Sequence, residues 1–408
     1  MRILYLHPNA WTGEYPMLVK LRELGHEVCA LEEKRGLEHG SRHRTDYFRI
    51  AGDDIRTLWY DPRHGWKRIL TWPFDRIFRR AFDGRNLVHR MWVIREAVRT
   101  FSPDVVVCSD GFTYAIPAAF LKRLGLLRPR LIATYIGGDI LDCPEAAVGK
   151  RRTPMVSWLI RTSVKSIDVM RPLCNSLAVI LRAEGADPRK IEILPMHLVA
   201  PRERLDAIRT DRDRIRADLR ASLGLGADDL VIITLSGNQA GKGLHLLAAA
   251  WSEIVCAVPS AKWLLCGPPD PWLERAVWPP LRAAGLDRTV VYAGRLTGDE
   301  VFRHLACADL HVNPTLCEGL NVVTIEAAAV GTPTITSDGA GISDWIARYD
   351  AGAVVPASEV APLADAIIGA LRNPAKLASW RASAPAMADE FLLERIAPAM
   401  QRLLSPQT

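Results

Sequence analysis

The chain has 408 residues, of which 49% are hydrophobic, 24% charged and 7% aromatic. This composition excludes a disordered or fibrous protein, and the length predicts two compact domains. No run of about 18 uncharged apolar residues occurs, so no membrane-spanning helix is expected. Residues 1–7 have the pattern of a strand and lack the features of a secretory signal, so the expected location is cytoplasmic.

The net charge of +6 is unevenly distributed. Residues 1–200 hold 32 Lys and Arg against 22 Asp and Glu (+10), whereas the remainder holds 20 against 24 (−4). The two halves are therefore expected to meet different partners. The cysteines lie in apolar segments without metal-ligand spacing and are predicted to be reduced core residues, namely Cys29, Cys108, Cys143, Cys174, Cys256, Cys266, Cys307 and Cys317.

Short runs rich in Val, Ile and Leu alternate with longer amphipathic stretches, which is typical of a parallel sheet covered by helices. In the first half, strands are expected at residues 2–6, 27–31, 104–108, 131–135 and 191–194. Residues 201–223 are charge-dense and helical without an apolar stripe, which indicates the domain junction. In the second half, strands are expected at residues 230–235, 262–266, 289–292, 310–313, 332–336 and 352–355. The fold class is α/β, with two doubly wound parallel sheets that bind ligands beyond the carboxyl ends of their strands.

The most informative segment directly follows the strand predicted at residues 310–313. Glu318 and Glu326 are separated by seven residues, and Asn321 between them is the expected cap of a helix. The start of that helix would offer free backbone N–H groups to a phosphate, and Glu326 could accept two hydrogen bonds from the diol of a ribose. The alternative is that Glu326 caps a neighbouring loop and Glu318 is solvated. The combination of strand, glycine and helix favours binding.

A second glycine-rich segment, residues 236–243, follows the first strand of the second half. Its glycines allow a ligand close to the backbone, and Lys242 supplies a charge for a diphosphate, although a solvated lysine in a tight turn is the alternative. Lys242 precedes Gly243 rather than Ser or Thr, which argues against a Walker phosphate loop. The segment from Gly339 to Gly341 lacks the third glycine of a nicotinamide-binding fingerprint.

These motifs, together with Pro314, Gly331-Thr332-Pro333, Gly25-His26-Glu27-Val28 and Gly137-Gly138-Asp139, resemble the group 1 (family 4) retaining glycosyltransferases. The resemblance covers essentially the whole chain and is most specific over residues 230–356. It implies a GT-B fold, in which two Rossmann-like domains face a central cleft. Residues 1–200 would bind the acceptor, residues 201–380 would bind a nucleotide sugar, and a C-terminal helix within residues 381–408 would cross back to the first domain.

The resemblance implies that Glu318 contacts the donor sugar, Glu326 the ribose and Lys242 the diphosphate. The implied donor site also includes Gly13, Gly237, Asn238, Arg295, Leu296, Gly319, Leu320, Asn321 and Val322. The candidate catalytic residues are Glu318, Lys242 and Asp139, and the candidate acceptor-binding residues are His7, Trp11, Asp110 and Asp139. Asp110 and Asp139 could equally cap helices.

The implied reaction transfers a sugar, with retention, from a UDP- or GDP-linked donor to a hydroxyl of a glycan or lipid-linked acceptor, without a metal or other cofactor. Cell-envelope polysaccharide or glycolipid synthesis is the expected setting. Three departures from the family pattern occur: Asn238 replaces an arginine, Ile136 replaces a histidine, and residues 195–199 and Thr12-Gly13 differ from the usual hinge and first-loop motifs. Asn238 and Ile136 leave a catalytically silent GT-B binding subunit as an alternative. A GT-B phosphorylase or sugar-phosphate synthase is the competing enzyme.

Residues 56–99 form a basic aromatic segment with 11 Lys and Arg against 4 Asp and Glu. Its interleaved aromatic residues are Trp59, Tyr60, Trp66, Trp72, Phe74, Phe78, Phe82 and Trp92. This mixture suggests docking on an anionic membrane surface, on the inner face of the cytoplasmic membrane, whereas the alternative is a core-facing aromatic side with a solvated basic side. Pro73 is expected to break any continuous amphipathic helix. Nucleic acid is not an expected partner, because no recognisable binding module is present.

Overall fold

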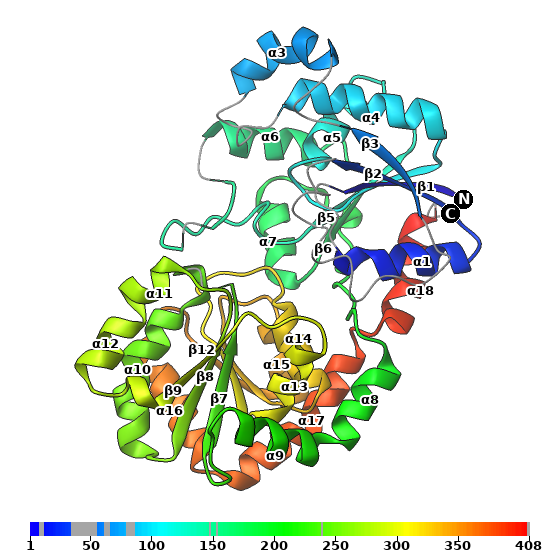
Figure 1. Cartoon of the computed structure of the whole chain (residues 1–408). Coiled ribbons are helices and arrows are strands. Elements are labelled where there is room, and N and C mark those ends of the chain that lie inside the picture. The colour runs from blue at the N-terminus through cyan, green and yellow to red at the C-terminus, as the bar shows by residue number, and fades with distance from the viewer. Residues whose placement is uncertain are drawn as a thin grey trace. The chain divides into compact units, whose positions relative to one another are not determined.

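The structure is a computed structural model that describes residues 1–7, 12–33, 55–60, 66–78, 86–146, 148–151, 154–237 and 240–405. The chain divides into two compact units (Figure 1). The first comprises Met1–Asp142, Gly149–Val199 and Leu393–Thr408, and the second comprises Cys143–Val148 and Ala200–Leu392.

Within the described residues, the first unit is built on a six-stranded sheet of order β3-β2-β1-β4-β5-β6. All neighbouring strands are parallel. The strands are β1 (Arg2–His7), β2 (Glu27–Glu33), β3 (Arg56–Tyr60), β4 (Val105–Cys108), β5 (Arg130–Tyr135) and β6 (Val169–Pro172). The helices are α1 (Tyr15–Glu23), α3 (Trp66–Phe78), α4 (Leu87–Phe101), α5 (Ala115–Arg123), α6 (Pro154–Val164), α7 (Asn175–Ala183) and α18 (Leu393–Leu404). Helices cover both faces, which is why the central strands are uninterrupted apolar runs.

The last helix of the chain completes the core of this first unit. Met400 and Leu404 of α18 are fully buried in the same hydrophobic cluster as Ile3 and Tyr5 of β1. Helix α18 also lies against α1 (Figure 1). The expected return of the C-terminal helix to the first domain is therefore confirmed.

The second unit repeats the architecture with the described strand order β12-β11-β10-β7-β8-β9, again all parallel. The strands are β7 (Leu230–Leu235), β8 (Ala261–Cys266), β9 (Val290–Gly294), β10 (Leu310–Asn313), β11 (Thr334–Ser337) and β12 (Gly352–Val355). The helices are α8 (Arg202–Thr210), α9 (Arg212–Ser222), α10 (Leu244–Ala257), α11 (Pro271–Ala276), α12 (Trp278–Ala283), α13 (Asp299–Cys307), α14 (Val322–Ala329), α15 (Ser343–Tyr349), α16 (Val360–Leu371) and α17 (Pro374–Asp389). Trp251 and Trp263, with ring centroids 5.5 Å apart, anchor its core.

Most of the predicted strands are present, with shifts of one or two residues at their ends. The strand predicted at residues 191–194 is wrong: Ile191 makes only an isolated bridge to Met170. The last strand of this sheet is instead β6 at Val169–Pro172, which the sequence analysis did not predict because a charged residue, Arg171, lies within it. Arg171 is fully buried and donates hydrogen bonds to the carbonyl oxygens of Leu194 (3.0 Å) and Pro195 (2.7 Å).

The basic aromatic segment is part of the ordinary fold of the first unit. It contributes β3, α3 and α4, of which β3 is an edge strand. The prediction that Pro73 breaks the helix is wrong, because Pro73 lies inside α3. Pro73 itself is exposed.

The charge-dense residues 201–223 form α8 and α9, which belong to the second unit. Helix α9 packs through arginines rather than through an apolar stripe. Arg220 and Arg216 donate to the two carboxylate oxygens of Asp309 at 2.7 and 2.6 Å. This explains a helix that is held against the unit although its sequence lacks hydrophobic periodicity.

All eight cysteines are free, and five of them are buried as expected. The core assignment is wrong for Cys256, which is exposed, and incomplete for Cys143 and Cys317, which are partly exposed. Within the described part of the chain, no helix is both long and apolar enough to cross a membrane.

Candidate active site

The loop that follows β7 lies close to the loop that follows β10, and this close approach requires a glycine at position 243. Gly243 has φ +69°, and a Cβ at this position would overlap the carbonyl oxygen of Pro314. Thr315 adds two contacts nearby. Its hydroxyl donates to the carbonyl oxygen of Gly241 (2.8 Å), and the carbonyl oxygen of Thr315 accepts from the hydroxyl of Ser337. Thr315 was not among the predicted site residues, although its place two residues after the end of β10 was the available signal.

Helix α14 begins in this site and presents free backbone donors. Asn321 caps it as predicted: its Oδ1 accepts from the amide of Thr324 at 2.9 Å, and its own φ is +66°. No described residue accepts a hydrogen bond from the backbone N–H of Leu320, Asn321 or Val322. These donors and the positive end of the helix dipole form a site suited to a phosphate group.

Glu318 lies beside these donors and is fixed through its backbone. Its N–H donates to the carbonyl oxygen of Gly339 (2.9 Å), and its carbonyl accepts from the N–H of Gly341 (3.2 Å). Its carboxylate forms an ion pair with Lys242 and accepts from Nδ2 of Asn321 at 2.7 Å. Both members of the ion pair are partly accessible, with side-chain exposures of 24% for Lys242 and 19% for Glu318. An incoming diphosphate would compete with Glu318 for the lysine.

Glu326 is one helical turn further along α14 and is partly exposed. Burial raises the pKa of its carboxyl from the usual 4.5 to about 7. The loop-capping alternative finds no support, because no described residue forms a hydrogen bond or ion pair with this carboxylate. Its oxygens are available to accept hydrogen bonds from a ligand.

Both halves of the chain match protein families of one enzyme class. Residues 229–373 match the model described as glycosyl transferases group 1, and residues 15–197 match the glycosyl transferase 4-like domain. The chain is a group 1 glycosyltransferase. This confirms the resemblance noted in the sequence.

The relatives of this glycosyltransferase are distant. It is 24% identical over 306 residues to the colanic acid biosynthesis glycosyltransferase WcaL of Salmonella typhimurium, an alignment that covers 74% of this chain and 69% of the relative. It is 28% identical over 227 residues to the D-inositol 3-phosphate glycosyltransferase of Rhodococcus erythropolis, covering 53% of this chain and about half (48%) of that relative. Among solved structures, Anabaena HepE in complex with UDP aligns over 99% of both chains with a TM-score of 0.75 and 15% identity. The expected GT-B fold is thereby confirmed.

The first unit of the glycosyltransferase holds the acceptor candidates, and its two aspartates bind backbone. Asp139 is buried and accepts hydrogen bonds from the amides of Gly111 (2.7 Å), Ile136 (3.1 Å) and Gly137 (2.9 Å). Burial is the main cause that raises the pKa of its carboxyl to about 6. Asp110 likewise accepts from the amide of Phe112 at 2.9 Å. Both therefore cap loops, and any contact with an acceptor stays a prediction.

The other predicted site residues are placed as follows. His7 is the last residue of β1, whereas Trp11 and Asn238 lie outside the described residues. Gly13 lies in a short 3-10 turn, Gly237 has open space around it, and Gly319 lies between Glu318 and the start of α14. Arg295, exposed, and Leu296, half-buried, follow β9 directly. The roles of these residues stay predictions.

Proposed function

We propose that this glycosyltransferase transfers a sugar from a nucleoside diphosphate sugar to an acceptor hydroxyl, with retention at the anomeric carbon. The observation that carries the proposal is the arrangement around the start of α14. Free amides lie between the Lys242–Glu318 pair and the unpartnered carboxylate of Glu326. The presence of UDP in the HepE structure, whose fold this chain shares, supports a nucleotide donor.

In the proposed complex, the diphosphate accepts hydrogen bonds from the free amides of α14 and from Lys242. Release of Glu318 from the lysine leaves its carboxylate to bind hydroxyls of the transferred sugar. Glu326 accepts hydrogen bonds from the two ribose hydroxyls, and the backbone around Arg295 and Leu296 lies beside the base. The implied remaining donor contacts are Gly13, Gly237 and Asn238.

The reaction breaks the bond between the anomeric carbon and the diphosphate oxygen. The acceptor oxygen attacks the carbon from the face that the diphosphate leaves, and the acceptor proton passes to the departing phosphate oxygen. Lys242 and the α14 amides stabilise the charge that develops on this leaving group, which is where electrostatic stabilisation contributes most. Glu318 orients the sugar rather than attacking it.

A panel of UDP- and GDP-linked sugars tests this function. A donor that binds the folded state raises its melting temperature, and slow release of UDP or GDP then demonstrates turnover. We expect Lys242→Ala to weaken UDP or GDP binding by about tenfold or more while leaving uridine or guanosine binding unchanged, because only the nucleotides carry phosphate. Lys262→Ala, on β8, is the matched control. Binding without any turnover would instead indicate a silent binding subunit.

We further propose that the acceptor is presented at an anionic membrane surface, as expected for envelope glycolipid synthesis. Helix α3 exposes Leu70 (56%), Trp72 (50%) and Phe74 (59%). The guanidinium of Arg76 lies over the Trp72 ring at 5.5 Å. Asp75 fixes α3 to α4 because its carboxylate accepts from the amides of Val88 and His89, so the helix that carries these exposed side chains is held in place.

Co-sedimentation with vesicles of phosphatidylglycerol and phosphatidylcholine tests the membrane proposal. The wild type is expected to pellet, and both the double variant Trp72→Ala/Phe74→Ala and Arg76→Glu are expected to remain in solution. Arg189→Glu, at a side chain 89% exposed elsewhere in the first unit, is the control for charge alone. A wild type that stays in the supernatant, or equal losses for Arg189→Glu and Arg76→Glu, would contradict docking through α3.

A further inference from the structure

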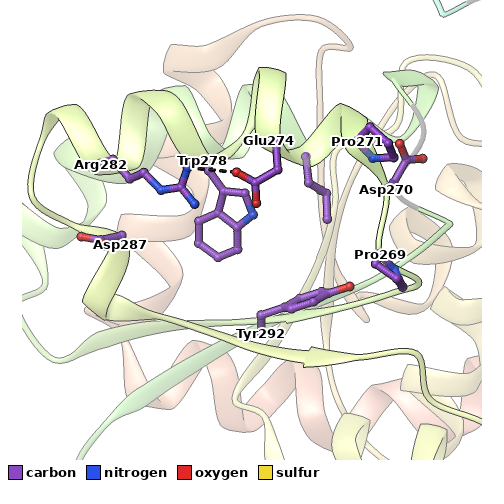
Figure 2. A pocket seen from close by; sticks show the side chains of 9 residues that line it. Pro269, Asp270, Pro271, Glu274, Trp278, Arg282, Asp287 and Tyr292 are labelled. Carbon is purple, nitrogen blue, oxygen red and sulfur yellow. Dashed lines mark hydrogen bonds and ion pairs between the residues drawn. The ribbon is translucent and has the colours of Figure 1, made fainter.

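A pocket of about 500 Å³ lies beside the edge strand of the second sheet, and none of the residues assigned to the donor lines it (Figure 2). Helices α11 and α12 form one side, and β9 forms the other. Its main lining residues are Pro269, Asp270, Glu274, Trp278, Arg282 and Tyr292. None of the residues around the start of α14 contributes to it. The volume is typical of a small-molecule site.

Two aromatic rings form an open corner in this pocket. Trp278 and Tyr292 have ring centroids 6.5 Å apart and planes at 87°, and Figure 2 shows both rings on the cavity. Tyr292 is 39% exposed, yet its position is fixed because its hydroxyl donates to the carbonyl oxygen of Gly267 at 2.9 Å. The guanidinium of Arg282 lies 5.7 Å from the Trp278 ring centroid. The corner thus offers apolar ring surface to a ligand. Because the Tyr292 ring is already held in place, binding a ligand would cost little side-chain conformational entropy.

Hydrogen-bonding groups surround these rings. Glu274 pairs with Arg282 at 2.9 Å, and both side chains are more than half exposed, so each keeps capacity for a ligand. Asp270 accepts from the amide of Trp272 through Oδ1 at 2.8 Å, and no described residue donates to its Oδ2. Asp287 lies at the far end of the cavity (Figure 2). The polar groups are therefore mainly acceptors, which suits a ligand rich in hydroxyl donors.

The charge of the pocket restricts the ligand further. Three carboxylates, Asp270, Glu274 and Asp287, face one guanidinium, Arg282, so the local formal charge is −2. Such a site disfavours phosphates, nucleotides and acidic sugars through like-charge repulsion. An uncharged ligand with both apolar C–H faces and several hydroxyl groups matches the aromatic corner and the acceptors together. A neutral pyranose has this combination.

We propose that this pocket binds a neutral saccharide, with a pyranose face on Trp278 or Tyr292 and its hydroxyls on Asp270 and Glu274. This goes beyond the proposed function, because binding here requires no transfer at the α14 site. A glycan held by this second site stays near the enzyme between encounters, which raises its effective concentration. The site would thus favour long neutral glycans over single sugars.

Saccharide titration with tryptophan fluorescence and saturation-transfer NMR tests the proposal. The probes are the methyl glycosides of glucose, galactose, mannose and N-acetylglucosamine, together with maltose and cellobiose. We expect at least one probe to bind with a dissociation constant on the order of millimolar, and Glu274→Gln to weaken it about tenfold. Trp278→Ala is expected to abolish that binding. The exposed Glu274 provides a variant that leaves the fold intact if removal of Trp278 does not.

Control variants separate this site from the donor site. Glu326→Gln should leave saccharide binding unchanged, and Trp278→Ala and Glu274→Gln should leave the UDP- or GDP-induced thermal shift unchanged. The proposal is overturned if no probe binds, or if binding survives both pocket substitutions. It is equally overturned if either substitution abolishes binding of uridine or guanosine, because the pocket would then hold the base of the nucleotide.

Discussion

Replacing Glu326 by Gln should stabilise the free enzyme and weaken its binding of nucleotide. Burial raises the pKa of Glu326 from 4.5 to about 7, so the folded state binds this proton more tightly than the unfolded state. The free energy of unfolding therefore falls as the pH rises from 4.5 through 7, and the full loss is present above pH 7. A difference of about 2.5 in pKa corresponds to about 3 kcal/mol, an upper limit because the carboxyl is partly exposed.

Glu326→Gln is expected to weaken nucleotide binding although it stabilises the free enzyme. The carboxylate accounts for the proposed ribose contact, and its loss should cost about 2 kcal/mol of UDP or GDP binding, or about thirtyfold in affinity. The neutral amide introduced by Glu326→Gln lacks the ionisation that makes the buried carboxylate unfavourable. Greater stability without ligand combined with weaker ligand binding is the signature of a group held ready for a substrate.

Urea denaturation at pH 4.5 and pH 8, and calorimetric titration with UDP and GDP, measure the two effects. The stability difference between Glu326→Gln and the wild type should be close to zero at the lower pH and largest at the higher pH. Glu253→Gln, on the exposed side of α10, is the control and should change neither quantity. A variant that is less stable than the wild type at pH 8, or one that binds both nucleotides as tightly, would refute this reasoning.

Three further substitutions probe the scaffold, each by urea denaturation. Gly243→Ala should cost several kcal/mol more than Gly285→Ala, because both glycines have nearly the same positive φ but only the first meets a backbone carbonyl; equal losses would exclude the close contact. Arg220→Ala should cost about 3–5 kcal/mol and Arg214→Ala less than about 1 kcal/mol, since the first breaks a buried ion pair and the second an exposed one. Asp139→Ala should cost about 2–4 kcal/mol because three backbone amides lose their acceptor; an unchanged denaturation midpoint would contradict its capping role.

The features predicted correctly from the sequence depend on residues that are close together in the chain. The central strands β1, β4 and β7 consist mainly of apolar residues because both faces of their sheets are covered. The cap of α14 could also be predicted from the sequence, because Asn321 and Thr324, whose amide it binds, are only three residues apart. In both cases the residues that determine the structure are neighbours in the sequence, so a short segment is sufficient to predict the strand or the helix cap.

The features that were missed depend on pairings across the fold. Lys242 and Glu318 are 76 positions apart in the sequence, and nothing in the sequence indicates that their side chains form an ion pair in the free enzyme. Strand β6 is concealed by Arg171, whose burial is possible only because the chain from Leu194 to Pro195 supplies carbonyl acceptors. The burial of Arg220 was missed for a similar reason. An arginine is normally expected at the surface, and only the fold brings Asp309 close enough to pair with it.

The placement of α18 has a consequence for biosynthesis. The hydrophobic cluster that contains Ile3 and Tyr5 of β1 also includes Ile396, Met400 and Leu404, so the first unit lacks part of its interior until these residues have left the ribosome. The second unit, which ends at Leu392, has all its residues earlier. Nascent chains should therefore acquire protease resistance in the second unit first, in the reverse of the usual N-terminal-first order.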